Sequence, residues 1–300
     1  AFRQVLASPS LRKRAREEGI NLAYVPGSGP KGRISHQDFD AFLTSGLTAG
    51  STTGLATGGD LAVQAPLPLN TTREIKLSGM RRVIARKMLA SKRNIPHYSY
   101  IEEVDVTELE SLRAHLNTER ETHQPKLTLL PFLALALVKV LPRFPHCNAR
   151  FDDEAEVLTE FDAVHLGVAT MTDAGLMVPV LTHCEVMDVW QVAAEVARLS
   201  DLARDGKASP QQLSGATITI SSLGAIGGIA TTPIINAPET TIVGVNKMQE
   251  RPVVRKGEIV VRTMMNLSAS FDHRIVDGYD GAQLVQSLKS KLENPGAIFV

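Results

Sequence analysis

The sequence is poor in cysteine and aromatic residues and carries no net charge. Its 300 residues include two cysteines, one tryptophan and 5% aromatic residues, and 32 basic side chains balance 32 acidic ones. Two distant cysteines, Cys147 and Cys184, cannot build a disulfide framework, which favours a reducing compartment. A net charge of zero favours neither nucleic acid nor an anionic membrane as a partner.

Long apolar runs and metal-ligand clusters are also missing. The longest apolar run, 127–141, contains Pro131 and Lys139 and is too short to span a bilayer. It predicts a buried core helix and no membrane partner. Each cysteine follows a histidine, but metal sites usually place their ligands in tighter C-x2-C or H-x3-H pairs. We therefore expect no metal site and interpret both thiols as buried or strand-end.

A change in composition divides the chain into three parts. Residues 1–43 are compact and charged, and residues 71–300 carry regular apolar patterns. Residues 44–70 are rich in Gly, Ser, Thr, Ala and Pro, with Asp60 as their only charge. Such a segment cannot bury enough apolar surface to offset its ordering entropy. We expect a small domain at 1–43, a flexible linker at 44–70 and a large domain at 71–300.

The first part predicts a small helical domain with a basic surface. Ser8-Pro9 begins a helix that Gly19 ends, and Ser35 precedes a short helix. The glycine-rich loop at 26–33 lacks the Lys-Ser/Thr ending of a phosphate-binding loop. Seven basic residues face four acidic ones in this part. They form either a solvated helix face or a docking patch for an acidic partner.

The large part alternates helix and strand patterns. Thr107-x-x-Glu110 is a capping-box pattern, and Asp188 precedes an amphipathic helix that ends near Gly206. A last helix is expected at about 280–293. Strands are expected at 164–170, 176–181, 216–223, 241–246, 253–254 and 259–271, with a hairpin turn at Lys256-Gly257. Hairpin signals without regular βαβ repetition predict an α/β (α+β) domain with a mostly antiparallel or mixed sheet.

The motif Asp272-His273-Arg274-Ile275-Val276-Asp277-Gly278 lies where a strand ends and a helix begins. Histidine is the side chain best suited to move a proton near neutral pH. Asp277 is close enough in sequence to return toward His273 or to pair with an arginine. A lone histidine beside charges is more often structural, and the pattern alone leaves both interpretations open.

A second motif, Thr217-Ile218-Thr219-Ile220-Ser221-Ser222-Leu223-Gly224, runs from a strand into a turn rich in serine and glycine. Such a turn exposes hydroxyl and backbone N–H groups. It is also what an ordinary strand-to-loop transition looks like, so the pattern alone does not establish a site.

Both motifs resemble those of the dihydrolipoamide acyltransferases, the E2 components of 2-oxo acid dehydrogenase complexes. The histidine motif is also similar to that of the related chloramphenicol acetyltransferases. The resemblance implies a chloramphenicol-acetyltransferase-like catalytic domain in which His273 is the general base and Asp277 is mainly structural. It implies that a serine donates a hydrogen bond to the oxyanion; Ser221 fits best, and the adjacent Ser222 stays open.

The resemblance also implies where coenzyme A and the lipoyl group bind. Candidates for the coenzyme A or lipoyl channel are Ser222, Gly224, Asn236 in the stretch 233–239, and Arg82 in a basic stretch at 78–88. A solvated basic helix face is the alternative interpretation of Arg82. No lipoyl domain lies in these 300 residues, so the lipoyl group is expected on a domain outside this chain.

Residues 1–43 resemble the peripheral subunit-binding domain of E2 proteins. Ala7-Ser8-Pro9-Ser10-Leu11-Arg12-Lys13 and Gly27-Ser28-Gly29-Pro30-Lys31-Gly32-Arg33-Ile34, with Asp38, carry the resemblance. That family binds E3 (dihydrolipoamide dehydrogenase) or E1 through basic residues. The matching positions here are Arg12, Lys13 and Arg33.

The resemblance further implies an assembly and a substrate. E2 catalytic domains form trimers with the active site between subunits, and trimers build larger cores, often 24-mers, with C-terminal apolar residues such as 297–300 between trimers. The stretches 95–105 and 292–295 resemble the branched-chain type most, so we expect branched-chain acyl transfer. Alternatives are a pyruvate-type E2 and a non-catalytic E3-binding scaffold. The expected location is the bacterial cytoplasm or the mitochondrial matrix.

Overall fold

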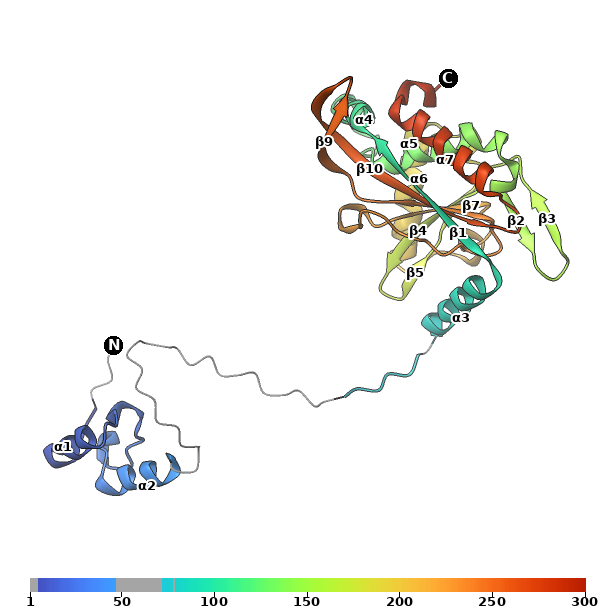
Figure 1. Ribbon diagram of the computed structural model, residues 1–300. Helices are drawn as coiled ribbons and strands as arrows, with labels where there is room; N and C mark the ends of the chain where they lie inside the picture. Colours follow the sequence, from blue (N-terminus) through green and yellow to red (C-terminus); the bar gives the residue numbers. More distant parts are fainter. Residues whose placement is uncertain (1–4, 47–71, 78) are drawn as a thin grey trace. The chain divides into compact units, whose positions relative to one another are not determined.

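The computed structural model describes residues 5–46, 72–77 and 79–300. The chain divides into two compact units, Ala1–Thr72 and Arg73–Val300 (Figure 1). The linker predicted at 44–70 lies outside the described residues from position 47 onward. The boundaries of the three predicted parts therefore stay predictions.

The small unit is built from two helices joined by a loop with two short 3-10 turns. Helix α1 (Pro9–Glu17) begins with Ser8, whose hydroxyl accepts from the Leu11 backbone N–H as predicted. The 3-10 turns η1 (Leu22–Tyr24) and η2 (Pro30–Gly32) precede α2 (His36–Gly46). Its small core consists of Leu11, Ala15, Val25, Ile34 and Phe39.

The loop of the small unit is fastened to α2 by one carboxylate. Asp38 accepts hydrogen bonds from the backbone N–H groups of Ser35 and Ser28 at 2.9 and 3.0 Å and from the Ser28 hydroxyl at 2.7 Å. Those donors hold the pKa of Asp38 well below its usual range. The glycine-rich loop is thus held to α2 by a carboxylate.

The large unit is organised around an eight-stranded mixed sheet (Figure 1). Its main path is β1-β10-β8-β7-β4-β5, with β6 beside β4 and β9 beside β10. Strand β7 runs parallel to β4 and β8, and the other pairs are antiparallel. The mixed sheet predicted from the sequence is confirmed. The strands are β1 (His97–Asp105), β4 (Leu166–Thr172), β5 (Gly175–Met177), β6 (Val180–Leu181), β7 (Ile218–Ser222), β8 (Thr241–Val245), β9 (Gln249–Arg255) and β10 (Glu258–Asp272).

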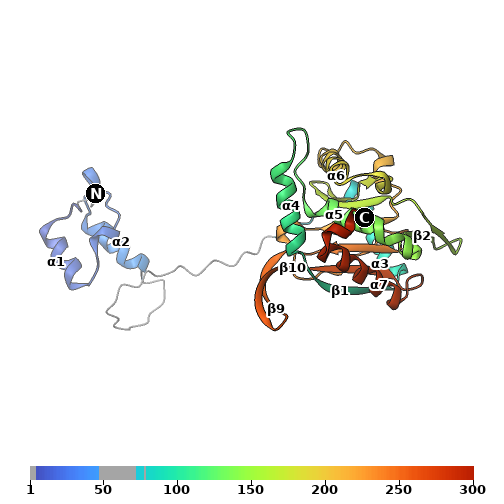
Figure 2. The same ribbon diagram turned by 90° about the horizontal axis from the view of Figure 1, so that it is seen from above.

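Helices cover this sheet and extend from it. Helix α5 contacts both α6 and α7, while α6 packs on β4 and α7 on β1 (Figure 2). Helix α3 contacts β5, and a separate hairpin of β2 and β3 stands beside the sheet. The remaining elements are α3 (Gly79–Asn94), α4 (Thr107–Glu119), α5 (Leu129–Val140), β2 (Ala149–Asp152), β3 (Val157–Glu160), α6 (Val189–Arg204), α7 (Gly278–Glu293), and the 3-10 turns η3 (Leu141–Arg143), η4 (Pro145–Cys147), η5 (Cys184–Val186), η6 (Pro210–Leu213), η7 (Gly224–Ile226) and η8 (Pro295–Ile298).

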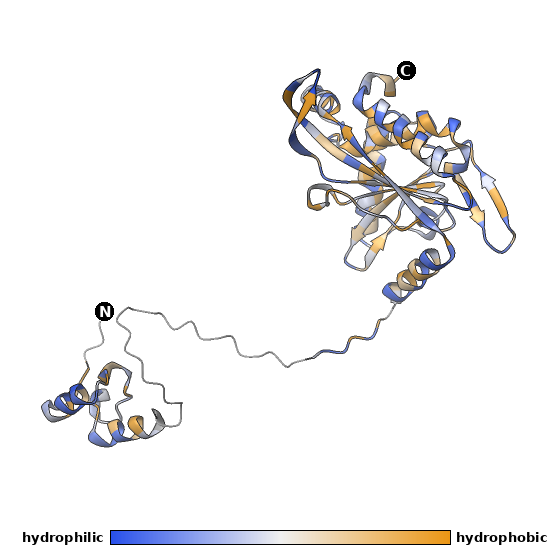
Figure 3. Ribbon diagram, viewed as in Figure 1, coloured by the Kyte–Doolittle hydropathy of each residue, from blue (hydrophilic) through white to orange (hydrophobic). Residues whose placement is uncertain are grey.

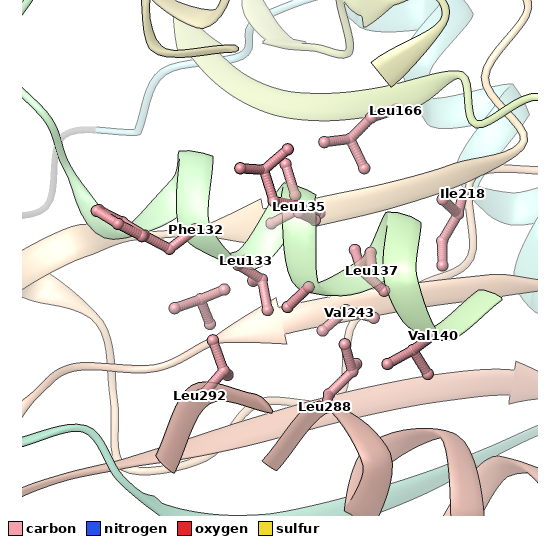
Figure 4. Packing of buried hydrophobic residues seen from close by; sticks show 14 of the residues in the cluster. Phe132, Leu133, Leu135, Leu137, Val140, Leu166, Ile218, Val243, Leu288 and Leu292 are labelled. Atoms are coloured by element: carbon pink, nitrogen blue, oxygen red, sulfur yellow. The ribbon is translucent and has the colours of Figure 1, made fainter. Parts of the chain in front are cut away.

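The core lies between these helices and the sheet. Every residue of α5 except Lys139 is apolar, and the helix is buried as predicted. Figure 3 shows apolar ribbon gathered in the interior of the large unit. Figure 4 shows side chains of α5 meeting Leu166, Ile218 and Val243 of the sheet and Leu288 and Leu292 of α7. Fully burying one such side chain stabilises the fold by roughly 1.5–3 kcal/mol.

Two local predictions are wrong, and one hairpin was not predicted. Thr107 is not an N-cap: its hydroxyl donates to Asp105 at 2.7 Å, and Asp105 also accepts from the Thr107 backbone N–H. The strand expected at 176–181 is split into β5 and β6. The β2–β3 hairpin was not predicted, because strands of four residues leave little periodic signal.

The two cysteines are free and buried, as predicted. Burial raises the pKa of each thiol to about 12, so neither is a reactive thiolate. Within residues 5–46, 72–77 and 79–300, no helix is long and apolar enough to cross a membrane. No group of three or more potential ligand side chains for a metal ion occurs in the same ranges.

Candidate active site

His273 lies in a short turn between β10 and α7. Its backbone N–H donates to the Pro96 carbonyl at 3.2 Å, which fastens the turn to the start of β1. The imidazole is exposed, and its ring centroid lies 4.5 Å from that of Tyr98.

The turn is stabilised by a buried carboxylate beside the histidine. Asp272 is 1% exposed and pairs with Arg274, whose Nη2 lies 2.6 Å from Oδ2 of Asp272. Arg274 also reaches Asp153 on the β2–β3 hairpin at 2.8 Å and lies over the ring of Phe151. These hydrogen bonds raise the pKa of Arg274 further, so its charge is permanent. This ion pair was not predicted from the sequence.

Asp277 occupies the N-cap position of α7. Its backbone carbonyl accepts from the Gly281 N–H and from the Tyr98 hydroxyl. Its carboxylate makes no hydrogen bond or ion pair with any residue that the structure describes. We expected this carboxylate to contact His273 or to pair with an arginine. Within one chain it does neither, and Arg274 forms its ion pair with Asp272.

The two candidate serines sit at the end of β7. Ser221 faces Gly244 on β8 and Ala169 on β4 in the register of the sheet. The Ser222 hydroxyl accepts from the Gly224 backbone N–H at 3.2 Å and thereby shapes the turn. Gly224 has φ +57, a conformation that favours glycine. Ser222 and Gly224 thus form the turn, while no described residue binds the Ser221 hydroxyl.

One chain does not bring Ser221 and His273 together. In the register of the sheet, Ser221 of β7 pairs with Gly244 of β8, and Gly244 pairs with Ser268 of β10. His273 follows Ser268 by five residues, just beyond the end of β10. At about 3.3 Å per residue, this is a separation of roughly 16 Å along the sheet, far beyond the reach of one reacting group. A site that contains both must take them from different chains.

Asn236 is held between the exposed Lys87 and the buried Glu239. Its amide nitrogen donates to Glu239 at 2.5 Å, and its oxygen accepts from Nζ of Lys87 on α3 at 2.7 Å. Burial raises the pKa of Glu239 to about 7, although Thr219, Asn236 and Lys87 oppose the shift. Asn236 therefore ties α3 to the loop before β8. The sequence predicted no role for Glu239, because nothing in the neighbouring residues indicates that this carboxylate is buried.

Arg82 on α3 and His97 at the start of β1 differ in their contacts. Arg82 is exposed on α3 and has no hydrogen bond or ion pair with the described residues. His97 bridges two backbone segments: Nδ1 lies 2.9 Å from the Ile95 carbonyl, and Nε2 accepts from the Ile235 N–H at 3.0 Å. Burial lowers the pKa of His97, which fits a neutral, structural ring.

The three basic residues proposed for partner binding differ in their surroundings. Arg12 donates from Nη2 to the Val5 carbonyl at 2.6 Å and from Nε to the Ala7 carbonyl at 3.4 Å. Lys13 is 81% exposed, with Glu17 at 3.9 Å. Arg33 is exposed and unpaired among described residues. Lys13 and Arg33 are thus available to a partner, and Arg12 also holds its own domain.

Comparison with known families agrees with this geometry. Residues 69–300 match the model of the 2-oxoacid dehydrogenases acyltransferase catalytic domain. The chain belongs to the 2-oxoacid dehydrogenase acyltransferase family. Residues 5–38 match the E3-binding domain. Both family assignments made from the sequence are confirmed, and the chain is an acyltransferase by family.

Relatives of this acyltransferase support the same assignment. The lipoamide acyltransferase component of the branched-chain alpha-keto acid dehydrogenase complex of Pseudomonas aeruginosa is 54% identical over 98% of this chain and 67% of that protein. The acetyltransferase component of the pyruvate dehydrogenase complex of Staphylococcus aureus is 38% identical over 98% of this chain and 70% of that protein.

Solved structures of related acyltransferases share the fold. The dihydrolipoamide acetyltransferase (E2p) of Azotobacter vinelandii matches with a TM-score of 0.74 and 34% identity over 79% of this chain and all of that one. The cubic core of a pyruvate dehydrogenase multienzyme complex matches with a TM-score of 0.73 and 34% identity over 83% of this chain and all of that one. The prediction of an E2-type catalytic fold is confirmed.

Proposed function

We propose that this chain transfers a branched-chain acyl group between dihydrolipoyl-lysine and coenzyme A, as the E2 core of a branched-chain 2-oxo acid dehydrogenase complex. The higher identity to the branched-chain relative, 54% against 38% for the pyruvate-type relative, favours this substrate class. The single observation that carries the chemistry is the exposed His273 on a turn fixed by Asp272 and Arg274.

In this proposal His273 takes the proton of the coenzyme A thiol. A free thiol has a pKa of about 8.5 and is mostly un-ionised at neutral pH, so a positioned base helps it react. The thiolate forms a C–S bond with the carbonyl carbon of the acyl-dihydrolipoyl thioester. The tetrahedral intermediate then breaks its bond to the dihydrolipoyl sulfur, which takes the proton back from His273. Acyl-coenzyme A and dihydrolipoyl-lysine are the products, and no net proton is consumed.

Ser221 is proposed to donate its hydroxyl to the oxyanion of that intermediate. The E2p of Azotobacter vinelandii was studied for the roles of a serine, a histidine and an asparagine in its catalytic mechanism, and their spacings are 52 and four residues. Ser221, His273 and Asp277 have the same two spacings. This supports Ser221 over Ser222, and it places an aspartate here where that enzyme has asparagine.

Because Ser221 and His273 lie far apart in one chain, we propose that the site forms between neighbouring subunits of a trimer. Trimers then build a larger core, a 24-mer by analogy with the related cubic core. Asp277 serves the turn through its backbone. Arg82, exposed on α3, is proposed to meet a coenzyme A phosphate, whereas Ser222, Gly224 and Asn236 shape the walls of the channel.

Residues 5–38 are proposed to bind E3, E1 or both through Lys13 and Arg33, with a smaller contribution from Arg12. The lipoyl group is proposed to arrive on a domain outside the 300 residues. Since the relatives reported above are bacterial, we place the complex in the bacterial cytoplasm rather than the mitochondrial matrix.

The test is acyl transfer in the reverse direction, from isobutyryl-, isovaleryl- or acetyl-coenzyme A to dihydrolipoamide. We expect the branched acyl groups to react fastest and His273→Ala to lower the rate by about 10²–10⁴. Faster reaction with acetyl would indicate a pyruvate-type E2. Full activity in His273→Ala would refute the mechanism, and a folded but inactive wild type would indicate a scaffold.

A further inference from the structure

Tyr98 on β1 contacts the active-site turn at both of its ends. Its ring lies against the imidazole of His273, with 4.5 Å between centroids and a tilt of 50°. Its hydroxyl donates to the backbone carbonyl of Asp277 at 2.8 Å. The Tyr98 ring also stacks on the ring of Phe271, with 5.2 Å between the centroids and 26° between the planes. One side chain thus connects the histidine to the first residue before α7.

The Asp277 carbonyl is itself part of the helix. It accepts from the Gly281 N–H at 3.0 Å, the first backbone hydrogen bond of α7, in addition to the bond from Tyr98. At the other end of the turn, the His273 N–H donates to Pro96. The chain at 96–98 therefore holds the turn at both ends, through the Pro96 carbonyl at His273 and through the Tyr98 side chain at Asp277.

The helix leaves room for the tyrosine by means of a glycine. Gly281 is buried in the first turn of α7, and a Cβ atom there would overlap the Tyr98 hydroxyl and approach the Phe271 ring to 3.0 Å. Glycine is otherwise unfavourable inside a helix, since it costs more backbone entropy than alanine. The glycine and the tyrosine hydroxyl are thus complementary.

The imidazole has few other restraints. It makes no hydrogen bond or ion pair with a side chain in residues 72–77 and 79–300. A general base must hold its nitrogen within hydrogen-bond reach of the proton it removes, and a loosely held ring loses rate. We propose that Tyr98 is a positioning residue that sets the orientation of His273 toward the coenzyme A thiol. This inference rests on the function proposed above.

The experiment separates the ring of Tyr98 from its hydroxyl. Tyr98→Phe keeps the ring and should lower kcat by about threefold to tenfold, the value of one hydrogen bond. Tyr98→Leu removes both contacts and should lower kcat by roughly tenfold to 100-fold. Tyr100→Phe is the matched control. Tyr100 lies two residues after Tyr98 on β1, and its hydroxyl accepts from Gln286 of α7 at 3.0 Å. Removing this hydroxyl should leave kcat unchanged.

Two readouts distinguish positioning from a loss of folded enzyme. The acid limb of the pH profile of kcat/KM reports protonation of the essential base. It should be displaced in Tyr98→Leu, because an aromatic ring acts differently on imidazole and imidazolium, and unmoved in Tyr100→Phe. Loss of folded protein would scale the whole profile without displacing it.

The second readout is rescue. Gly281→Ala alone should lower kcat, since its methyl group displaces the hydroxyl of Tyr98. The double variant Gly281→Ala/Tyr98→Phe should recover to within about threefold of Tyr98→Phe, because the overlapping atom is gone. Additive losses and an unmoved acid limb would overturn the positioning role. His273→Ala, run alongside, tests the proposed function separately: if it stays active, that function fails whatever the Tyr98 variants do.

Discussion

Adjacent residues with the same side chain can have different tasks, and the two serines of β7 illustrate this. The Ser222 hydroxyl is used in the chain itself, where it accepts from the Gly224 N–H. The Ser221 hydroxyl has no such partner among the described residues. Ala169 and Gly244 flank Ser221 on the neighbouring strands β4 and β8.

We therefore expect Ser221→Ala to lower kcat by about 10²–10³, the usual loss for one oxyanion donor. Ser222→Ala, the matched control, should keep kcat within about tenfold and instead lower stability by about 1 kcal/mol through the turn. Steady-state kinetics and thermal unfolding of both variants decide between them. The reverse order of effects would assign the oxyanion donor to Ser222.

Glu239 gives the fold a predictable response to pH. Its pKa rises from about 4.5 in the unfolded chain to about 7 in the fold, so the folded state holds the proton more tightly. Stability should therefore fall as pH rises from about 4.5 to 7. Glu239→Gln removes this loss. The free energy of unfolding of the variant should exceed that of the wild type by up to about 3 kcal/mol above pH 7 and equal it near pH 4. Urea unfolding at several pH values measures the difference; parallel pH curves would contradict it.

At the scale of elements, helix starts divide into those with a side-chain cap and those fixed by tertiary contacts. Helix α6 has a complete capping box, in which Asp188 accepts from the Trp190 and Gln191 N–H groups and Gln191 returns the bond. Helix α4 has none, because Thr107 is held between Asp105 and the Thr263 N–H.

Asp188→Ala should consequently destabilise the large unit by about 1 kcal/mol, within the range of 0.5–2 kcal/mol for lost N-caps. Asp201→Ala, an exposed change in the same helix, serves as the control and should stay within about 0.5 kcal/mol. Chemical denaturation of both variants provides the comparison. Equal losses would show that the cap contributes nothing beyond an exposed charge.

At the scale of the whole molecule, the separation of Ser221 from His273 predicts activity that depends on neighbouring subunits. In a trimer that mixes His273→Ala and Ser221→Ala chains, one of the three sites has both residues intact. Random 1:1 mixing should then restore about a quarter of wild-type activity. Assay of co-expressed variants against each alone measures it, and no recovery would place both residues of the site in one chain.

Sequence reasoning succeeded for elements with strong periodic patterns. The helix at 127–141, the Asp188 cap and the hairpin at Lys256-Gly257 appear as expected. It failed at 176–181, at Thr107 and at the β2–β3 hairpin. In each case the deciding partner is distant in sequence or the element is too short for a pattern.

Local features follow from the amino-acid sequence: the periodicity of each long element, the motifs around Ser221 and His273, and the family they resemble. Which side chains contact one another became known only from the folded chain. It paired Arg274 with Asp272 and Asp153, linked Lys87 to Asn236, and placed Tyr98 between His273 and Asp277. The reason is physical: a strand or helix follows from neighbouring residues, whereas a contact between β1 and α7 depends on how the whole sheet closes over its core.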